Sequence, residues 1–166
     1  ERTEGWIAGL QLAALSMQGR DDVGAFIRAF TGSHVYIAEY LVDEVLKQQA
    51  EEMQAFLLQT SILDRLNGSL CEAVTGAPDG QGRLAALQRS NIFINPLDAQ
   101  GRWFRYHQLF ADLLRARLQT GRSKAEVQAL HRRAAGWHEQ NGMTGEAVDH
   151  ALAAGDVPGA ARLIEE

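Results

Sequence analysis

A period of two in hydrophobicity appears late in this chain, at residues 92–106, which read IFINPLDAQGRWFRY. Aromatic and β-branched residues dominate both ends of the stretch, at 92–97 and 102–106, and such runs are typical of β-strands. Between them lie four small or polar residues, Asp98 to Gly101, and a short loop ending in glycine is typical of hairpins. The stretch therefore predicts a β-hairpin.

Three helices are predicted before the hairpin, because apolar residues there recur at helical spacing. They cover residues 53–60, 69–74 and 84–91. Between them we expect a short extended piece at 61–63, an Asn67-Gly68 turn leading to a capping Ser69, and a flexible glycine-rich connector at 76–82. Three helices followed by a hairpin is the order of a winged helix. The fold class is therefore predicted to be mainly α with a winged-helix core.

Further helices are expected on both sides of this core. Upstream, they cover residues 3–15, 22–30 and 34–49. Downstream, a long helix follows the hairpin, with Arg115 and Arg117 predicted to point away from its apolar face, and another begins at Ser123. Gly142 and Gly155 then each open an alanine-rich helix with the spacing Gly-x4-Ala. Such helices suggest the start of a repeat array, and we expect the chain to be a segment of a longer polypeptide.

The composition restricts the class of protein. The net charge is −5 and the pI is about 5.5, whereas a free-standing nucleic-acid binder usually has a basic face. A single cysteine, Cys71, excludes a disulfide within the chain and a cysteine-based zinc site. The most apolar stretch, Trp6 to Leu15, is too short to cross a bilayer. We expect a cytoplasmic protein with no membrane partner.

No enzyme motif is found in the sequence. The P-loop, the Gly-x-Ser-x-Gly elbow and the His-Glu-x-x-His zinc motif are all missing, so the chain is predicted not to be an enzyme. Cys71 has the acidic Glu72 beside it and is predicted to be buried rather than a nucleophile. His131, His138 and His150 are separated by seven and twelve residues. That spacing is not a tight metal signature, so surface or packing roles are expected and no metal site is predicted.

His107 is the candidate binding residue. It stands where the second hairpin strand runs into a helix, in the sequence RYHQLF at 105–110. The start of a helix carries unpaired N–H groups and the positive end of its dipole, which favour an anion. A histidine there can donate a hydrogen bond to a phosphate. The alternative is that His107 caps its own helix or packs against the wing.

A winged helix can also bind DNA. The cations and amides available for this are Arg83, Gln88, Arg89 and Asn91 on the last predicted helix before the hairpin, and Arg102 and Arg105 on the wing. Binding to the DNA backbone needs several cations on one face. Acidic residues, including Glu72, Asp79 and Asp98, dilute this set, so a wing that faces protein is favoured.

Four segments of the chain resemble the MalT-like, large LuxR-type transcriptional regulators. They read TEGWIAGLQLAAL at 3–15, FLLQTSILDRL at 56–66, YHQLFADLL at 106–114, and LHRRAA continuing to AAGD at 130–156. The resemblance follows the same order along almost the whole chain. It implies three parts here: the end of a helical lid domain at 1–32, the winged helix at 33–120, and the first helices of a TPR-like superhelical sensor region at 121–166.

The resemblance also implies a nucleotide switch. Such regulators carry a P-loop nucleotide-binding domain before this region and a DNA-binding helix-turn-helix after it, and both would lie outside this chain. In the wider class of signalling NTPases, a winged-helix histidine contacts the β-phosphate of bound ADP, and His107 is similarly placed. The stretch GLQLA at 9–13 resembles the Gly-Leu-Pro-Leu-Ala motif near the adenine, with Gln11 in place of proline.

Three hypotheses follow from these observations. In the first, the winged helix holds an ADP-bound resting state against the nucleotide-binding domain of the same polypeptide, and ATP exchange follows inducer binding to the superhelical region. DNA would be bound only by the domain outside this chain. In the second, the chain is a stand-alone winged-helix DNA binder. In the third, it is a structural adaptor for protein partners, and His107 only caps its helix.

Overall fold

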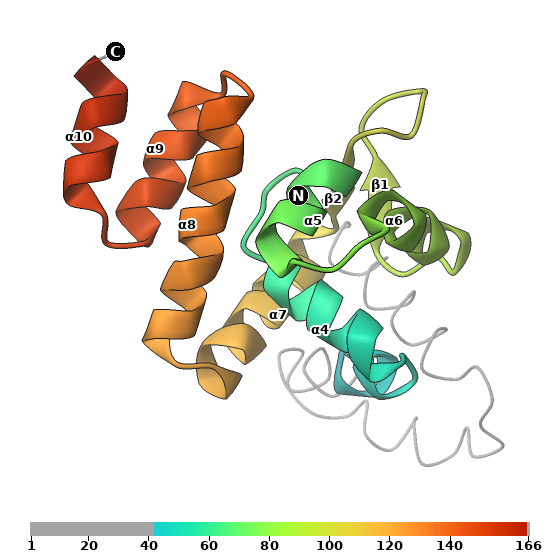
Figure 1. Ribbon diagram of the computed structural model, residues 1–166. Coiled ribbons are helices and arrows are strands. Elements are labelled where there is room, and N and C mark those ends of the chain that lie inside the picture. The colour runs from blue at the N-terminus through green and yellow to red at the C-terminus, as the bar shows by residue number, and fades with distance from the viewer. Residues whose placement is uncertain (1–41, 166) are drawn as a thin grey trace, which may run out of the picture.

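The computed structural model of the chain describes residues 42–165 (Figure 1). After a helical stretch at 42–47, three helices follow in order: α4 (Glu51–Thr60), α5 (Gly68–Thr75) and α6 (Gly80–Arg89). The antiparallel hairpin of β1 (Ile94–Pro96) and β2 (Phe104–Tyr106) comes next. This order confirms the predicted fold class, which is mainly helical with a winged-helix core.

The cap of α5 and the start of α6 differ from the prediction. Asn67, not Ser69, caps α5, because its side chain accepts a hydrogen bond from the backbone N–H of Leu70 at 2.8 Å. The predicted connector at 76–82 was too long, since α6 begins at Gly80. A side chain at Gly80 would lie 2.3 Å from the backbone oxygen of Gly68, so the close approach of the two helix starts requires glycine.

One residue of the loop before α5 pairs with the hairpin through its backbone. Leu66 and Phe104 exchange two backbone hydrogen bonds of 2.8 Å and form an isolated antiparallel bridge. The extended piece predicted at 61–63 was therefore wrong in position. Ser61 and Ile62 instead form a turn, in which the Ser61 hydroxyl donates to the Leu58 carbonyl at 2.7 Å. At the wing tip, Asp98 accepts bonds from the backbone N–H groups of the two residues before β2.

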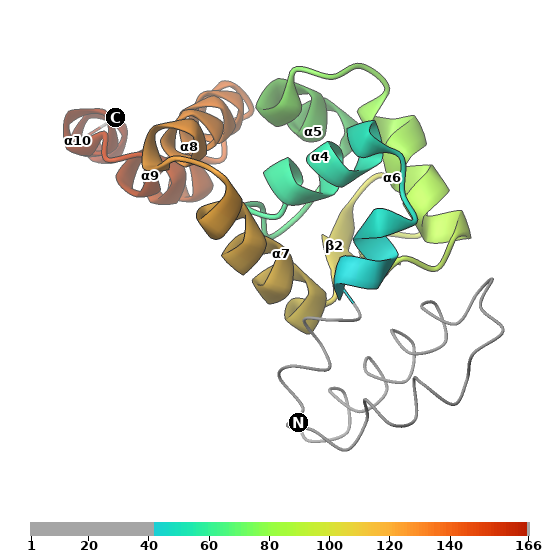
Figure 2. The ribbon, with the colours of Figure 1, turned by 90° about the horizontal axis from the view of Figure 1, so that it is seen from below.

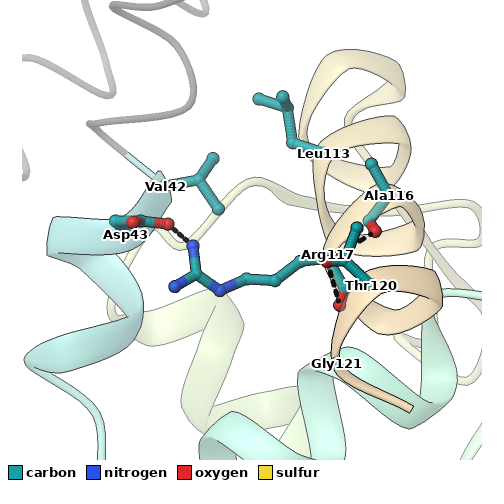
Figure 3. Close-up of a pocket in the computed structure, with 7 residues that line it drawn as sticks. All are labelled: Val42, Asp43, Leu113, Ala116, Arg117, Thr120 and Gly121. Carbon is teal, nitrogen blue, oxygen red and sulfur yellow. Dashed lines mark hydrogen bonds and ion pairs between the residues drawn. The ribbon is translucent and has the colours of Figure 1, made fainter. Parts of the chain in front are cut away.

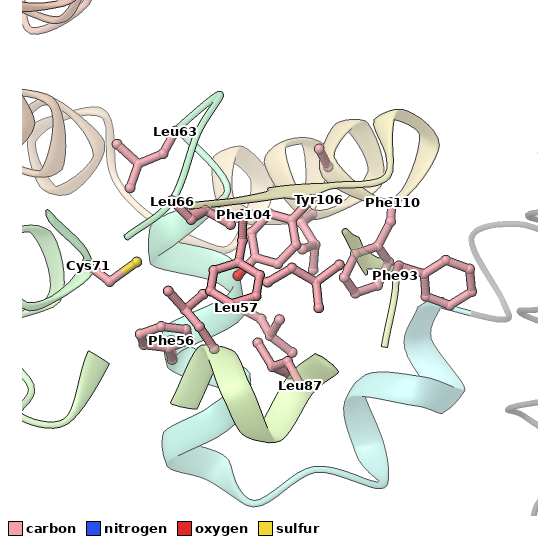
Figure 4. Close-up of a cluster of buried hydrophobic side chains, with 14 of the residues drawn as sticks. Phe56, Leu57, Leu63, Leu66, Cys71, Leu87, Phe93, Phe104, Tyr106 and Phe110 are labelled. Carbon is pink, nitrogen blue, oxygen red and sulfur yellow. The ribbon is translucent and has the colours of Figure 1, made fainter. Parts of the chain in front are cut away.

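One hydrophobic core lies between α4, α5, α6, the hairpin and α7 (Gln108–Gly121), as Figure 4 shows. Its largest fully buried side chains are Phe56, Phe104, Phe110, Leu57, Leu66, Leu70, Leu84, Leu87, Leu114 and Leu118. Each such side chain stabilises the fold by roughly 1.5–3 kcal/mol relative to an exposed position. The predicted apolar faces of residues 53–60, 84–91 and the long helix after the hairpin are confirmed by this packing.

Three helices complete the described part: α8 (Lys124–Gln140), α9 (Thr144–Ala153) and α10 (Val157–Glu165). Both ribbon views show them side by side to one side of the winged helix, with α8 nearest and α10 farthest (Figures 1 and 2). Ser123 caps α8 as predicted, and forms a reciprocal capping box with Glu126. Gly142 and Gly155 stand before α9 and α10 with φ of 71° and 77°, a left-handed conformation that glycine adopts without strain.

The prediction that Arg115 and Arg117 point away from the fold is wrong, because both contact neighbouring elements. Arg115 donates to the Ser61 carbonyl at 2.7 Å and pairs with Asp64 at 3.0 Å, which ties α7 to the loop after α4. Arg117 forms an ion pair with Asp43. Both arginines lie on the rim of α7, where a long side chain can reach across to the neighbouring element.

The three-part division of the chain stays a prediction, and residues 1–32 lie outside the described residues. Around the predicted boundary at 121, the two sides share a core: Leu130 and Ala134 of α8 are buried with the winged-helix residues. Between residues 42 and 165, no helix is both long and apolar enough to cross a membrane.

Candidate functional site

His107 lies at the corner where β2 passes into α7. Its backbone N–H donates to the Phe93 carbonyl at 2.7 Å, beside the Ile94–Tyr106 pair of the hairpin. Its carbonyl accepts from the N–H of Ala111 at 2.9 Å, which is the first bond of the helix. His107 is thus the N-cap residue of α7. These two bonds fix its backbone, and the sequence prediction of its place at the helix start is confirmed.

The side chain of His107 is half-buried and makes no capping hydrogen bond to its own helix. Its Nδ1 is buried and has no hydrogen-bond partner among residues 42–165. Without an acceptor for an Nδ1 proton, the neutral ring is expected to carry its proton on Nε2. The Nε2–H is then the donor, at a helix end where the first backbone N–H groups have no acceptor within the helix.

The turn between α6 and β1, which supplies the Phe93 carbonyl, has an unusual backbone. Asn91 and Phe93 have φ of 53° and 42°, and non-glycine residues rarely adopt this left-handed region. The Phe93 ring packs against Phe110 of α7 at a centroid distance of 5.1 Å, and Tyr106 meets the same ring edge-on at 5.9 Å. Aromatic packing therefore holds the strained turn against α7, and with it the Phe93 carbonyl that accepts the bond from His107.

Gln11, the other candidate binding residue, lies outside the described residues. At the C-terminal end of α7, a cavity of about 420 Å³ lies between this helix and the residues just before α4 (Figure 3). Among the described residues that line it, Asp43 and Arg117 are the one pair of opposite charges, and the others are apolar, small or hydroxyl-bearing. Because the arginine that lines it is already paired, this cavity is a poor site for an anion.

Arg83, one of the cations considered for DNA binding, is engaged in contacts within the fold. Arg83 donates to the carbonyls of Pro78 and Glu52 and lies over the Phe56 ring at 5.7 Å. It therefore holds α6 against α4. Gln88, Arg89 and Asn91 are exposed at the end of α6.

Cys71 is fully buried in the core, as predicted. Burial raises the pKa of its thiol to about 12, and the neighbouring Glu72 carboxylate acts in the same direction. A thiol of this kind is not a nucleophile near neutral pH.

Residues 42–127, more than half of the chain, match the family described as the MalT winged helix domain. The chain belongs to this family. It is also 42% identical over 164 residues to the serine/threonine-protein kinase PknK of Mycobacterium tuberculosis, covering 99% of this chain and 15% of that protein. It is 40% identical over 159 residues to the HTH-type transcriptional regulator MalT of Yersinia enterocolitica, covering 95% of this chain and 18% of that protein. The chain thus spans less than a fifth of these relatives.

The MalT winged helix ends near the start of α8, and a polar cavity of about 220 Å³ lies where it meets α8 and α9. From the winged helix, Arg65 and Trp103 line this cavity, and the guanidinium of Arg65 lies 5.4 Å from the Trp103 ring centre. Arg65 also pairs with Glu146 of α9 at 2.8 Å. Trp103 meets Trp137 of α8 edge-on at 6.3 Å. These contacts join the wing and the loop after α4 to both following helices.

Three histidines line the other side of the cavity, and we call them the histidine junction: His131 and His138 on α8, and His150 on α9. The Nδ1 atoms of His131 and His150 lie 2.9 Å apart. The rings of His138 and His150 stack at 5.3 Å with 8° between their planes. The three histidines have the packing role that was expected. Their spacing in the sequence did not predict that they form a cluster. No set of three or more metal-ligand side chains that could hold an ion occurs within residues 42–165.

A signal for this cluster was present in the sequence. His131 lies ten residues before Asn141 and His150 nine residues after it. If residues 141–142 are read as the turn of an antiparallel helical hairpin, positions about equally far from the turn face each other. The pairing of His131 with His150 follows from that reading, whereas linear spacing alone hid it.

Proposed function

We propose that this chain is a regulatory switch module of a transcriptional regulator, in which the winged helix holds a resting, ADP-bound state. Its membership in the MalT winged-helix family and its likeness to MalT regulators support the regulatory role. The likeness to a protein named a kinase suggests that one switch segment serves different output domains. The segment itself would carry out no catalysis.

His107 is the observation that carries the proposal. The backbone of His107 is held at the N-terminus of α7, its buried Nδ1 has no partner among the described residues, and a neutral ring with its proton on Nε2 can donate there. A β-phosphate of ADP is the acceptor that the family resemblance suggests, bound by the nucleotide-binding domain of the same polypeptide. The N–H groups and positive dipole end of α7 would add to the attraction of an anion.

The proposed switch works through a difference in binding. His107 would contact the nucleotide only while the winged helix is closed onto the nucleotide-binding domain, so bound ADP would favour the closed arrangement. A small-molecule or protein inducer on the superhelical region, together with exchange of ADP for ATP, would favour the open one. The contacts of Arg65 and Trp103 with α8 and α9 provide a physical path between the two regions. DNA would be bound by a domain outside this chain, in a cytoplasmic protein of the LuxR type.

The test is the nucleotide that the full-length parent protein retains through purification. Wild type is expected to retain ADP and to need inducer for transcription. His107→Ala is expected to lose ADP and to be active without inducer. His107→Gln, which keeps an N–H donor near the Nε2 position, should retain ADP in part. Gln108→Ala is the matched control, because within residues 42–165 the exposed Gln108 side chain bonds only Asp112, in the same helix.

Two results would contradict the proposal. Equal ADP content and equal inducer dependence in wild type and His107→Ala would mean that His107 is structural and the chain an adaptor. Tight, salt-sensitive binding of the 166-residue chain to a DNA duplex in a gel shift would instead favour a DNA-binding winged helix.

A further inference from the structure

The docking of α9 and α10 onto the rest of the fold depends little on large apolar side chains. Their small core consists of Ala147, Ala151, Ala160 and Leu163, with Ala135 and Val148 packed against it. Alanine buries little apolar area, so each such contact contributes far less than those of Phe or Leu. The polar histidine junction and the Arg65–Glu146 pair therefore supply an unusually large share of what holds α9 in place.

The Nδ1–Nδ1 contact between His131 and His150 is sensitive to protons. In two neutral rings, one Nδ1 donates and the other accepts across the 2.9 Å between them. The pair can accept one more proton on an outward nitrogen and keep this bond. After a second proton, both Nδ1 atoms carry hydrogen and two donors face each other, so the contact must break.

His138 adds two further penalties for protonation. Its ring stacks on His150 at 5.3 Å, so charge on both rings would bring two like charges together. Its Nδ1 is buried without a hydrogen-bond partner among residues 42–165, and a proton placed there would be a buried donor with no acceptor.

Charged groups face the histidines from three neighbouring elements. They are Asp64 and Arg65 in the loop after α4, Arg115 on α7, and Glu146 and Asp149 on α9. Asp64 is already paired with Arg115, and Glu146 with Arg65. Burial is the dominant influence and lowers the pKa of all three histidines, and for His150 the charges of His131 and His138 add to it and bring the pKa to about 4.

We propose that the histidine junction makes the docking of α9 and α10 sensitive to protons, so that mild acid releases these two helices from α8 and the winged helix while the main core stays folded. The direction follows from linkage. A histidine whose pKa is lower when docked than when released binds more protons in the released state. The docked state is thus fully stable above about pH 6.5, the ordinary histidine pKa, and loses stability as the pH falls from there toward the lowered values.

Hydrogen–deuterium exchange of the 166-residue chain between about pH 7.5 and 5.0, corrected for intrinsic exchange rates, tests this proposal. The readout is the opening of α9 and α10 amides relative to those of α4 to α6 in the same sample. We expect that ratio to rise as the pH falls, by up to about tenfold per pH unit for each proton taken up. A ratio that stays flat over this range would overturn the proposal.

Two variants separate the histidines from the carboxylates. His131→Asn with His150→Asn keeps an N–H to oxygen contact and removes both titrating rings, so the pH dependence should be mostly lost. Glu146→Gln should keep it and make the rise in opening larger at the acid end of the range. The Glu146 carboxylate favours protonation of docked His138 and His150, so its removal widens the difference between the docked and released pKa values. Loss of the dependence in Glu146→Gln, or its full retention in the double variant, would overturn the proposal.

A measurement on the wild type alone covers the case in which the double variant does not fold. NMR titration of the histidine ring resonances should show coupled, lowered midpoints for His131, His138 and His150, with shifts of α9 amides at the same pH. Independent titration of all three near the ordinary value would overturn the proposal.

Discussion

The hydroxyl groups of Thr60 and Tyr106 lie 2.8 Å apart in the core and join the last residue of α4 to the last residue of β2. The Thr60 hydroxyl also lies 2.7 Å from the Phe56 carbonyl, to which it donates its single proton. Tyr106 must therefore be the donor in the pair. This bond connects residues 46 positions apart and ends directly before His107.

The two partners of this bond should differ in their effect on stability. Tyr106→Phe removes the donor and should lower the free energy of unfolding by about 1 kcal/mol. Thr60→Val leaves the buried Tyr106 hydroxyl without its partner and should cost more, about 1–3 kcal/mol. Urea denaturation of both variants and of the double variant measures this. The double variant should cost less than the sum, and strict additivity would mean that the hydroxyls do not interact.

The cap of α5 can be tested by a pair of alanine substitutions. Asn67→Ala removes the side chain that binds the Leu70 N–H and should destabilise the chain by about 1 kcal/mol. Ser69→Ala removes a hydroxyl whose one bond within the described part of the chain goes to the Asn67 side chain, at 3.1 Å, and should stay within about 0.5 kcal/mol of wild type. Thermal unfolding distinguishes the two, and the reverse ranking would favour Ser69 as the cap.

Glycines in two conformations should respond oppositely to alanine. Gly136 lies inside α8, and the Cβ of an alanine there would meet nothing within 4 Å, so Gly136→Ala should stabilise by about 0.5–1 kcal/mol. Gly142 has equal space but a φ of 71°, so Gly142→Ala should destabilise by about 1 kcal/mol. Denaturation curves of both variants measure the change in unfolding free energy. Because neither site is crowded, a change of the same sign in both variants would show that backbone conformation does not explain the effects.

Cys71 should be unreactive in the folded chain. With a thiol pKa of about 12 and no exposed area, its reaction with a disulfide reagent at about pH 8 should be at least about a hundredfold slower than in the urea-unfolded chain. Release of the chromophore over time measures both rates. Similar rates would show that the segment around α5 opens readily.

The hairpin and the start of α8 could be predicted because their signals are local. Residues 92–106 alternate in hydrophobicity around a glycine-ending loop, and Ser123 with Glu126 is a capping box defined by two residues three positions apart. The place of His107 followed from the junction of a strand pattern with a helix pattern. Its chemical environment did not, because a buried Nδ1 without a partner is a property of packing.

Contacts between distant segments explain what was missed. Arg115 looks solvent-exposed on a helical wheel, yet its partners Ser61 and Asp64 come from a loop 54 and 51 residues earlier. The cap of α5 was misplaced because Asn67 and Ser69 are both good capping residues. Only the close approach of Gly68 and Gly80 settles where each helix begins.

The loop between α4 and α5 is a short connection that contacts three other elements: α7, α9 and the hairpin that forms the wing. Ser61 accepts a bond from α7, Asp64 pairs with the same helix, Arg65 reaches α9 and the wing, and Leu66 extends the hairpin. Surface loops ordinarily tolerate added residues, and this one should not. Among related sequences, insertions and deletions should occur at other turns, while the length of the segment 61–66 stays constant. A tag or cleavage site inserted into this segment should disrupt its contacts with α7, α9 and the wing at the same time.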